Sequence, residues 1–395
     1  MRPFDEHTSL MNMGNWQTFL AHHAANQQQA GRWRHRAVRK SGDERIDFAS
    51  NDYLGLSSDP RIIEAQQRGA QRHGAGSGAS HLVTGHCDVH HELEEALARH
   101  TGRERALLFS TGYMANLGVL QALCDSDCLV FQDRLNHASL LDGARLANAR
   151  SRRYHHANGD DLQRLLTRAA PGQRRLIVSD GVFSMDGDIA PLEALTSIAA
   201  HHHAWLMIDD AHGFGVLGEH GDGCVGQRYA SDQVQVLVGT LGKALGTAGA
   251  FVAGDATLID HLIQFARPYI YTTALPPGVA SASLESLSIC ASEPERRRHL
   301  QHLIAHFRAA ALTAGLPLMD SSTPIQPLLL GDEARVMRWS HQLAEQGLSV
   351  GAIRPPTVAA GQARLRITLS ARHDVGSIER LVNALQHCQQ GELQR

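Results

Sequence analysis

The segment QVQVLVGTLGKALGTAGAFVAG, residues 233–254, contains a single charged residue, Lys243. Both ends of the segment are short apolar runs, and its middle is rich in Gly, Ala and Thr. Short apolar runs bounded by glycines predict strands that are buried in a sheet. We therefore expect Lys243 to lie in a turn at the end of a buried strand, with no other charge nearby in the sequence.

The chain on either side of this segment alternates short apolar runs with longer amphipathic ones, from about residue 100 onward. This alternation predicts an α/β fold with a mostly parallel central sheet covered by helices on both faces. Ligands of such sheets bind at the carboxyl ends of the strands. The predicted strands are 106–109, 128–131, 176–178, 205–208, 236–238 and 250–253, and the predicted helices include 114–123 and 192–200.

A different pattern begins near residue 290. It predicts a long charged amphipathic helix over 291–312, followed by strand 324–330, helix 335–346, strand 364–369 and a last helix. We therefore predict three parts, which are an N-terminal helical segment at 1–45, a large α/β domain at 46–290 and a small α+β domain at 291–395. The N-terminal segment is expected to pack near the small domain.

Composition excludes several classes of protein. Of the 395 residues, 43% are hydrophobic and 19% are charged, which is typical of a globular protein rather than a disordered one. The net charge of −3 does not favour nucleic acid or an anionic membrane as a partner. The six cysteines form no CxxC pair and the 25 histidines are scattered, and we expect neither a secretory signal nor a membrane span. We therefore predict reduced thiols, no metal site and a cytoplasmic location.

The surroundings of Lys243 favour a chemical role. Lysine is normally a solvated surface group, and solvated lysines usually have other charges near them in the sequence. A desolvated ammonium group loses its proton more readily, and the neutral amine is the form that attacks an aldehyde. The small residues beside Lys243 leave room for a flat ring.

Two further residues strengthen this interpretation. Asp209 directly follows the apolar run 205–208, and a carboxylate at the end of a buried strand needs a cationic partner. A pyridinium nitrogen would be such a partner, and a protonated ring makes pyridoxal phosphate (PLP) an electron sink. His212, three residues later, is placed to reach the phenolic oxygen of that ring. Each residue alone fits an ordinary helix cap or loop, but the order Asp209, His212, Lys243 is more specific.

A phosphate site is predicted at FSTGYMANLG, residues 109–118. Here the predicted strand 106–109 passes through Ser110, Thr111 and Gly112 into a helix that begins near Tyr113. Free backbone N–H groups at a helix start, with hydroxyl groups beside them, suit a phosphate dianion. An ordinary Thr-capped helix is the alternative.

A dinucleotide-binding site, as in a nicotinamide-dependent dehydrogenase, is the competing interpretation. GFGVLG at 213–218 matches GxGxxG and follows a strand. However, Asp209 and Asp210 precede the glycines and would repel a pyrophosphate, and the following GEHGDGC is typical of a loop. GAGSGA at 74–79 follows a polar segment rather than a strand. The sequence around each glycine motif therefore disfavours a dehydrogenase.

The motifs together resemble the α-oxoamine synthases, which are fold-type-I PLP enzymes related to aminotransferases. The resemblance extends from about Asn15 to the C-terminus. The matching segments are FASNDYLGL (48–56), HGAGSGASHLVTG (73–85), LLFSTGYMAN (107–116), DRLNHASLLDG (133–143), SDGVFSMDGDIAPL (179–192), MIDDAHGFGVLG (207–218), GTLGKALG (239–246) and YTTALPP (271–277). The resemblance implies a PLP-dependent transferase of aminotransferase-like fold, with 46–290 as its PLP-binding domain.

The segment AIRPPTVAAGQARLRITLSARH at 352–373 is most similar to one branch of this family. That branch condenses L-alanine with pimeloyl-CoA or pimeloyl-acyl carrier protein, with loss of CO2, in biotin biosynthesis. Other branches condense glycine with acetyl-CoA or serine with a long acyl-CoA, and they remain the alternatives. The resemblance also implies a homodimer whose active site is shared across the interface.

The resemblance implies roles for five residues around the ring of PLP. Lys243 would hold PLP as a Schiff base and then remove the α-proton of the substrate. Asp209 would pair with the pyridine nitrogen, and His212 and Ser184 would contact the ring oxygen. His137 would stack on the opposite face of the ring and touch the substrate. Alternatively, His137 only caps a helix and Ser184 lies in an ordinary turn.

The phosphate and the substrates are also assigned by the resemblance. Gly112, Tyr113 and Thr240 would hold the phosphate, and Thr272 and Thr273 would reach the phosphate of the neighbouring subunit.

Arg366 would bind the carboxylate of the amino acid, a task that suits a guanidinium group. Thr357 and Arg34 match substrate-contacting positions, although a shorter segment in this region allows Arg32 to take the place of Arg34. Arg364 and Arg366 alternate along one strand, so one of them is expected to be a solvated charge at the rim.

Overall fold

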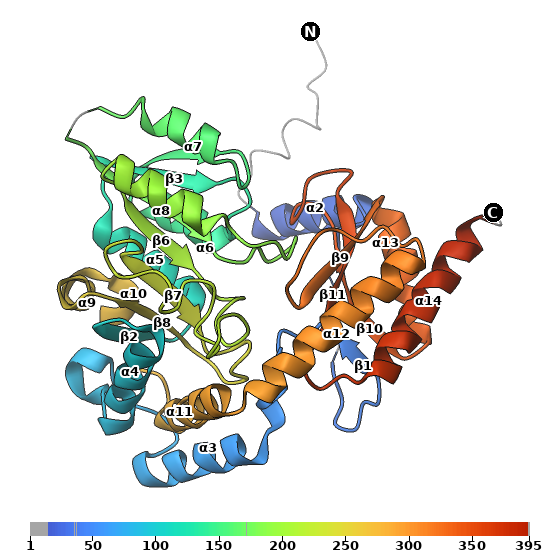
Figure 1. The fold of residues 1–395 in the computed structure, drawn as a ribbon, viewed down its shortest axis with the longest axis horizontal. Helices are drawn as coiled ribbons and strands as arrows, with labels where there is room; N and C mark the ends of the chain where they lie inside the picture. The colour runs from blue at the N-terminus through green and yellow to red at the C-terminus, as the bar shows by residue number, and fades with distance from the viewer. Residues whose placement is uncertain (1–14, 35, 37, 171, 394–395) are drawn as a thin grey trace.

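The computed structural model describes residues 15–34, 36, 38–170 and 172–393. Figure 1 shows two bodies, a larger one around a seven-stranded sheet and a smaller one around a four-stranded sheet, with the long helix α12 (Pro294–Thr313) extending from one to the other. Among the described residues, no helix is long and apolar enough to cross a membrane.

The seven-stranded sheet has the order β2-β8-β7-β6-β5-β3-β4. Its strands are β2 (Arg105–Phe109), β3 (Cys128–Asp133), β4 (Arg150–Tyr154), β5 (Arg174–Asp180), β6 (Trp205–Asp209), β7 (Val236–Thr240) and β8 (Ala250–Gly254). All neighbours are parallel except β8, which is antiparallel to both β2 and β7. The six strands predicted from apolar runs are confirmed, and β4 is an additional edge strand.

Helices cover both faces of this sheet, as predicted. Alternate side chains of β5 enter different cores. Leu176 and Val178 pack with residues of α5, α6 and α9, whereas Ile177 packs with residues of α7 and α8. The helices of this body are α3 (Pro60–His73), α4 (Asp88–Thr101), α5 (Gly112–Leu123), α6 (Ala138–Leu146), α7 (Gly159–Leu166), α8 (Leu192–His201), α9 (Ala256–Phe265), α10 (Arg267–Ile270) and α11 (Pro277–Ser292), with short helical turns at Leu56–Ser58 and His81–Gly85.

The four-stranded sheet has the order β1-β10-β11-β9. Its strands are β1 (Ile46–Phe48), β9 (Ile325–Gly331), β10 (Leu348–Ile353) and β11 (Ala363–Thr368), and α12, α13 (Glu333–Glu345) and α14 (Val375–Leu393) pack around it. β1 pairs in parallel with β10, so residues 46–48 join this C-terminal sheet rather than the large one. We propose that the small domain consists of residues 291–395 together with β1.

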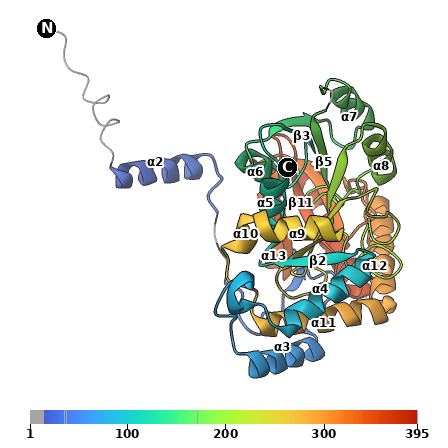
Figure 2. The same cartoon turned by 90° about the vertical axis from the view of Figure 1, so that its left-hand side faces the viewer.

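The described part of the N-terminal segment is helical only in α2 (Trp16–Gln29). Figure 2 shows α2 projecting away from the rest of the chain, and no residue of α2 is buried. The coil that follows contacts the small body, where Arg354 Nη1 donates to the carbonyl of Gly31 at 2.7 Å and Arg32 pairs with Glu333 at 3.6 Å. The predicted helical character of residues 1–14 lies outside the described residues.

Candidate active site

Polar side chains gather where the parallel strands of the large sheet end. Asp180 is the last residue of β5 and Asp209 is the last residue of β6, and the two are paired directly in the sheet. Thr240 ends the adjacent strand β7, and Lys243 lies in the turn that follows it. The residues predicted from strand ends are therefore brought to one edge of the sheet, where ligands of such folds bind.

Lys243 is held by a tight turn between β7 and β8. The turn is closed by backbone bonds from Leu241 N to Gly249 O at 2.9 Å and from Gly246 N to Lys243 O at 2.9 Å. Gly246 has φ of +66°, and a Cβ there would lie 2.3 Å from the backbone nitrogen of Ser57, so only glycine fits. Burial lowers the pKa of Lys243 to about 8, although Asp209 and Asp180 raise it. Lys243 is half-buried in the single chain, and its lowered pKa agrees with the predicted desolvation.

A chain of hydrogen bonds leads from Lys243 into the core. Lys243 Nζ lies 2.9 Å from His212 Nε2, and His212 Nδ1 lies 2.6 Å from Tyr53 Oη. Tyr53 Oη in turn donates to Asn51 Oδ1 at 3.2 Å. Burial, and then the charge of Lys243, lower the pKa of His212 well below its usual value, so the imidazole is neutral. The pattern assigns its proton to Nδ1, which leaves Nε2 free to accept from the amine.

Asp209 is buried, with 5% of its surface exposed. Its Oδ2 accepts a hydrogen bond from Asn116 Nδ2 at 2.6 Å, and its Oδ1 accepts one from Ala211 N at 3.0 Å. In the part of the chain that the structure describes, no cationic side chain forms an ion pair with it. A buried carboxylate in this state favours an added cation, and a protonated pyridine nitrogen meets that need.

Asp180 is a buried carboxyl that the sequence interpretation missed. Burial, and then the neighbouring Asp209, raise its pKa well above the usual value. Its Oδ2 accepts from the backbone N–H of His137 at 2.7 Å, which fixes the start of α6. A signal was present in the sequence, because Asp180 lies two residues after the apolar run 176–178, much as Asp209 directly follows 205–208.

The predicted phosphate site lies at the start of α5. The side chain of Thr111 caps this helix by accepting from Met114 N at 3.1 Å. The N–H groups of Gly112 and Tyr113 belong to the first turn and have no acceptor within the helix. A Cβ added at Gly112 would meet no atom within 4 Å, so space is open there. Thr240 Oγ1 instead donates to Gly249 O at 3.1 Å and stabilises the Lys243 turn.

His137 stands at the start of α6, and the backbone of Ser184 contacts Arg366. The side chain of His137 caps α6, where Nδ1 accepts from Ser139 N at 3.3 Å, so the capping alternative is present. Its ring lies edge-to-face with Tyr113, with ring centroids 6.2 Å apart. Ser184 is half-buried, and its carbonyl accepts from Arg366 Nε at 2.6 Å.

The expectation that Arg364 or Arg366 is a solvated rim charge is wrong. Both are buried, because every residue of β11 is covered by the neighbouring elements. Arg364 forms an ion pair with Asp186. Arg366 Nη1 donates to Thr368 Oγ1 at 2.9 Å, and its Nη2 donates to Asn51 Oδ1 at 3.1 Å. The bond to Asn51 connects Arg366 to the series of hydrogen bonds that ends at Lys243.

The other predicted residues make no side-chain hydrogen bond to Lys243 or to the described residues around it. Thr272 is half-buried, and Thr273, Thr357 and Arg34 are exposed. None of these four forms a hydrogen bond through its side chain to another described residue. Their predicted contacts with phosphate or substrate remain predictions.

The GFGVLG motif does not form a dinucleotide site. Residues 211–218 form turns and bends, and between β6 and β7 the described chain contains no helix. Asp210 is fully buried and accepts from Cys224 N at 2.8 Å, so its carboxyl group holds this loop together.

Comparison with known proteins agrees with this geometry. The family model for aminotransferase class I and II matches residues 43–385. An 8-amino-7-oxononanoate synthase of Chromohalobacter salexigens is 63% identical over 377 residues, which covers 95% of this chain and 98% of that protein. A second protein of that name, from Ectopseudomonas mendocina, is 58% identical over 352 residues and covers 89% of this chain and 90% of its own length.

Two solved structures show the same fold. A serine palmitoyltransferase from S. paucimobilis with a bound PLP–myriocin aldimine has a TM-score of 0.88 at 29% identity, covering 94% of this chain and 97% of that one. An 8-amino-7-oxononanoate synthase from Francisella tularensis has a TM-score of 0.78 at 33% identity, covering 89% of this chain and 99% of that one.

PLP is the cofactor of this fold family, and the donor set fits it. Lys243 supplies an amine, Asp209 supplies a buried carboxylate that forms no ion pair with a described side chain, and the start of α5 supplies free N–H groups. The chain belongs to the aminotransferase class I and II family, in its group of PLP-dependent 8-amino-7-oxononanoate synthases.

Proposed function

We propose that this chain condenses L-alanine with a pimeloyl thioester to give 8-amino-7-oxononanoate, CO2 and the free thiol carrier, in biotin biosynthesis. The observation that carries the proposal is the amine of Lys243, which has a pKa of about 8 and lies 2.9 Å from His212 Nε2. This amine lies at the edge of the large sheet where β6 ends in Asp209. The sequence identity of 63% to an 8-amino-7-oxononanoate synthase supports the choice of substrates.

When bound, PLP supplies an electron-accepting ring that stabilises negative charge at the α-carbon of alanine. Asp209 would hold the pyridine nitrogen protonated, and Asn116 would hold the carboxylate of Asp209 in place at 2.6 Å. The free N–H groups of Gly112 and Tyr113 would bind the phosphate, with Thr240 close by on the Lys243 turn. His212 and Ser184 would contact the ring oxygen.

Lys243 would carry the cofactor and then move the proton. With a pKa of about 8, roughly a tenth of its amine is neutral at pH 7, far more than for a solvated lysine. Its Nζ would take the α-proton of alanine and return a proton to the product. In the structure His212 Nε2 accepts from Nζ, which positions the amine before PLP binds; once the cofactor occupies the site, the same nitrogen would be free to contact the ring oxygen.

The carboxylate of alanine would bind Arg366. This guanidinium is held by Ser184 O, Thr368 Oγ1 and Asn51 Oδ1, so its position is set before substrate arrives. His137, Thr357 and Arg34, or Arg32 in its place, would contact the substrate at other points.

We propose that the enzyme is a homodimer. Thr272 and Thr273 would reach the phosphate in the partner, and α2 exposes the apolar side chains of Trp16, Phe19 and Leu20, none of which is buried among the described residues. Sedimentation equilibrium of the holoenzyme should give twice the chain mass of 43.0 kDa, and a monomer that remains active would contradict the shared site.

We also propose a cytoplasmic location, since all six cysteines are free and therefore suit a reducing compartment.

The proposal is tested by a product assay. The holoenzyme is incubated with L-alanine and pimeloyl-CoA, or with pimeloyl-acyl carrier protein, and the product is identified by mass. The mass of 8-amino-7-oxononanoate is expected. Parallel reactions with glycine and acetyl-CoA, or serine and a long acyl-CoA, should give little product. A preference for either pair would assign the chain to another α-oxoamine synthase.

A further inference from the structure

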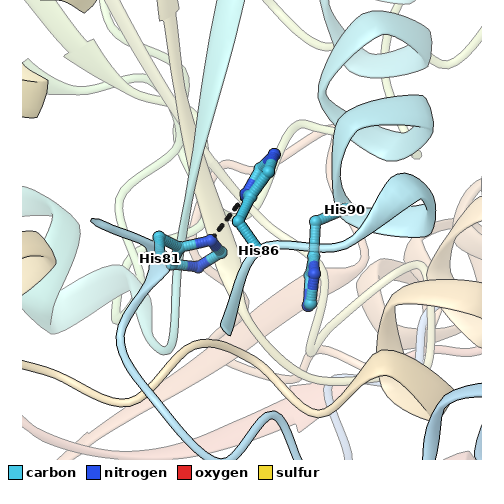
Figure 3. A group of neighbouring side chains, drawn as sticks. All are labelled: His81, His86 and His90. Carbon is cyan, nitrogen blue, oxygen red and sulfur yellow. Dashed lines mark hydrogen bonds between the residues drawn. The ribbon is translucent and has the colours of Figure 1, made fainter. Parts of the chain in front are cut away.

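Three histidines gather beside the large sheet, as Figure 3 shows for His81, His86 and His90. His81 Nδ1 and His86 Nδ1 are 2.8 Å apart, and the ring of His81 stacks on Tyr269 with centroids 5.0 Å apart. Burial lowers the pKa of His81 to about 3 and also lowers the pKa values of His86 and His90. All three imidazoles are therefore neutral at physiological pH.

The hydrogen bonds of His90 show what this cluster does. His90 Nδ1 accepts from Cys87 N at 3.1 Å, and His90 Nε2 donates to Leu275 O at 2.6 Å. Both nitrogens are therefore occupied, and a metal ion at the cluster would have to break one of these bonds. His90 instead connects the start of α4 to a segment that follows α10.

That segment, residues 272–275, is held by residues 77–90 at several points. Leu275 O also accepts from Ser77 Oγ at 2.7 Å. Ala274 N donates to Ala79 O at 3.0 Å, and Thr273 forms an antiparallel bridge with Ser80. The hydroxyl groups of Thr272 and Thr273 make no hydrogen bond to any described residue, so the backbone is fixed while both hydroxyls are left available.

We propose that His90 and Ser77 are positioning residues for PLP: by holding the carbonyl of Leu275 they set where the hydroxyls of Thr272 and Thr273 meet the phosphate bound in the partner subunit. The inference rests on the proposed function, because it takes Thr272 and Thr273 as phosphate contacts. It adds a requirement for a neutral imidazole at residue 90, since Nδ1 must accept and Nε2–H must donate at the same time.

Two substitutions separate the two bonds of His90. In His90→Asn the amide reaches the position of Nδ1, so the bond to Cys87 N is kept and the bond to Leu275 O is lost. In His90→Gln the amide reaches the position of Nε2, so the bond to Leu275 O is kept and the bond to Cys87 N is lost. A role through Leu275 therefore predicts a defect in His90→Asn that His90→Gln largely restores.

The readout is the affinity of the apoenzyme for PLP, compared with its affinity for pyridoxal, which lacks the phosphate. His90→Asn should weaken PLP binding about tenfold, as expected for one lost buried hydrogen bond, and leave pyridoxal binding unchanged. His90→Gln should stay within about threefold of wild type. Ser77→Ala, which removes the second donor to Leu275 O, should weaken PLP binding in the same selective way.

Equal weakening of PLP and pyridoxal binding, or a larger defect in His90→Gln than in His90→Asn, would overturn the inference, because His90 would then act only as a cap of α4. If His90→Asn does not fold, Ser77→Ala decides the question by the same comparison, and unchanged PLP affinity there would overturn it. A wild-type enzyme with no PLP on Lys243 would refute the proposed function instead, so the two failures are distinct.

Discussion

The amine of Lys243 has a hydrogen-bond acceptor only while His212 keeps its proton on Nδ1. That proton faces Tyr53 Oη, which in turn donates to Asn51. Tyr53 is fully buried, and burial raises the pKa of its hydroxyl to about 12, so it stays protonated. A residue 159 positions from His212 therefore sets the tautomer on which the lysine depends.

Replacing Tyr53 with Phe tests the hydrogen bonds that connect Tyr53, His212 and Lys243. The substitution leaves His212 Nδ1–H without its acceptor, so Lys243 should be held less firmly, and kcat/KM should fall roughly tenfold while PLP stays bound. Steady-state kinetics and the absorbance of the bound cofactor provide the two readouts. Tyr229→Phe is the matched control, because Tyr229 is also buried but packs in the core beside α8. Unchanged kinetics in Tyr53→Phe would contradict the tautomer assignment.

Arg366 and Arg364 form a second matched pair. Both are buried on β11, but Arg366 is linked through Asn51 to the Lys243 chain, whereas Arg364 pairs with Asp186. Arg366→Lys removes the planar fork and should raise KM for alanine about 10- to 100-fold, with a smaller change in kcat. Arg364→Lys should lower thermal stability and leave KM for alanine within about twofold. Initial rates at varied alanine check both, and the opposite ranking of the two KM values would be incompatible with the proposed carboxylate site.

Sequence patterns predicted the elements whose side chains are buried on both faces. β6 and β7 are short apolar runs that end in polar residues, and this is why Asp209 and Lys243 were found. β4 was missed because its sequence, RSRRY, belongs to an exposed edge strand with four exposed residues. β1 was missed because it has only three residues and pairs with a strand 302 positions away.

Site residues could be predicted only where the sequence of a single strand and its following turn identifies them. Lys243, Asp209 and His212 stand at strand ends, and strand ends can be read from local sequence. Tyr53, Asn51 and Asn116 reach the site only through packing between distant elements. The burial of Arg364 was not predictable for the same reason, since the residues that cover it come from other parts of the chain.

His156 connects two elements near the site and gives a pH-dependent prediction. It bridges Asp133 at the end of β3, 3.0 Å away, and Asp188 beside the Ser184 turn, 2.8 Å away. Burial opposes its charge, but the two carboxylates outweigh burial and raise the pKa of His156 to about 9. Because the pKa is higher in the folded state than the unfolded value of about 6.5, the stabilisation is complete below pH 6.5 and is lost as pH rises through 9.

His156→Gln should therefore lower the stability of the holoenzyme by about 1–3 kcal/mol at pH 6 and by much less at pH 10. The difference in thermal midpoint between variant and wild type, followed by calorimetry across this range, checks the prediction. A destabilisation that does not change with pH would show that the charge of His156 is not what holds the two elements together.

At the scale of the molecule, the site is shared between the two bodies in Figure 1. The large sheet supplies Lys243, Asp209 and His212, and the small sheet supplies Arg366. Residues 49–53, which lie just after β1, join them through Tyr53 and Asn51. A change in the position of the small body would move Arg366 relative to Lys243, so the chain needs both sheets for one site.

Every role assigned to the site depends on Lys243 holding PLP through its amine. The most direct measurement is reduction of the holoenzyme with borohydride, followed by proteolysis and mass mapping of the pyridoxyl group. The adduct should lie on the peptide that contains Lys243, and Lys243→Ala should fold, carry no adduct and show no turnover. An adduct on a different residue, or appreciable product formation by Lys243→Ala, would contradict the account.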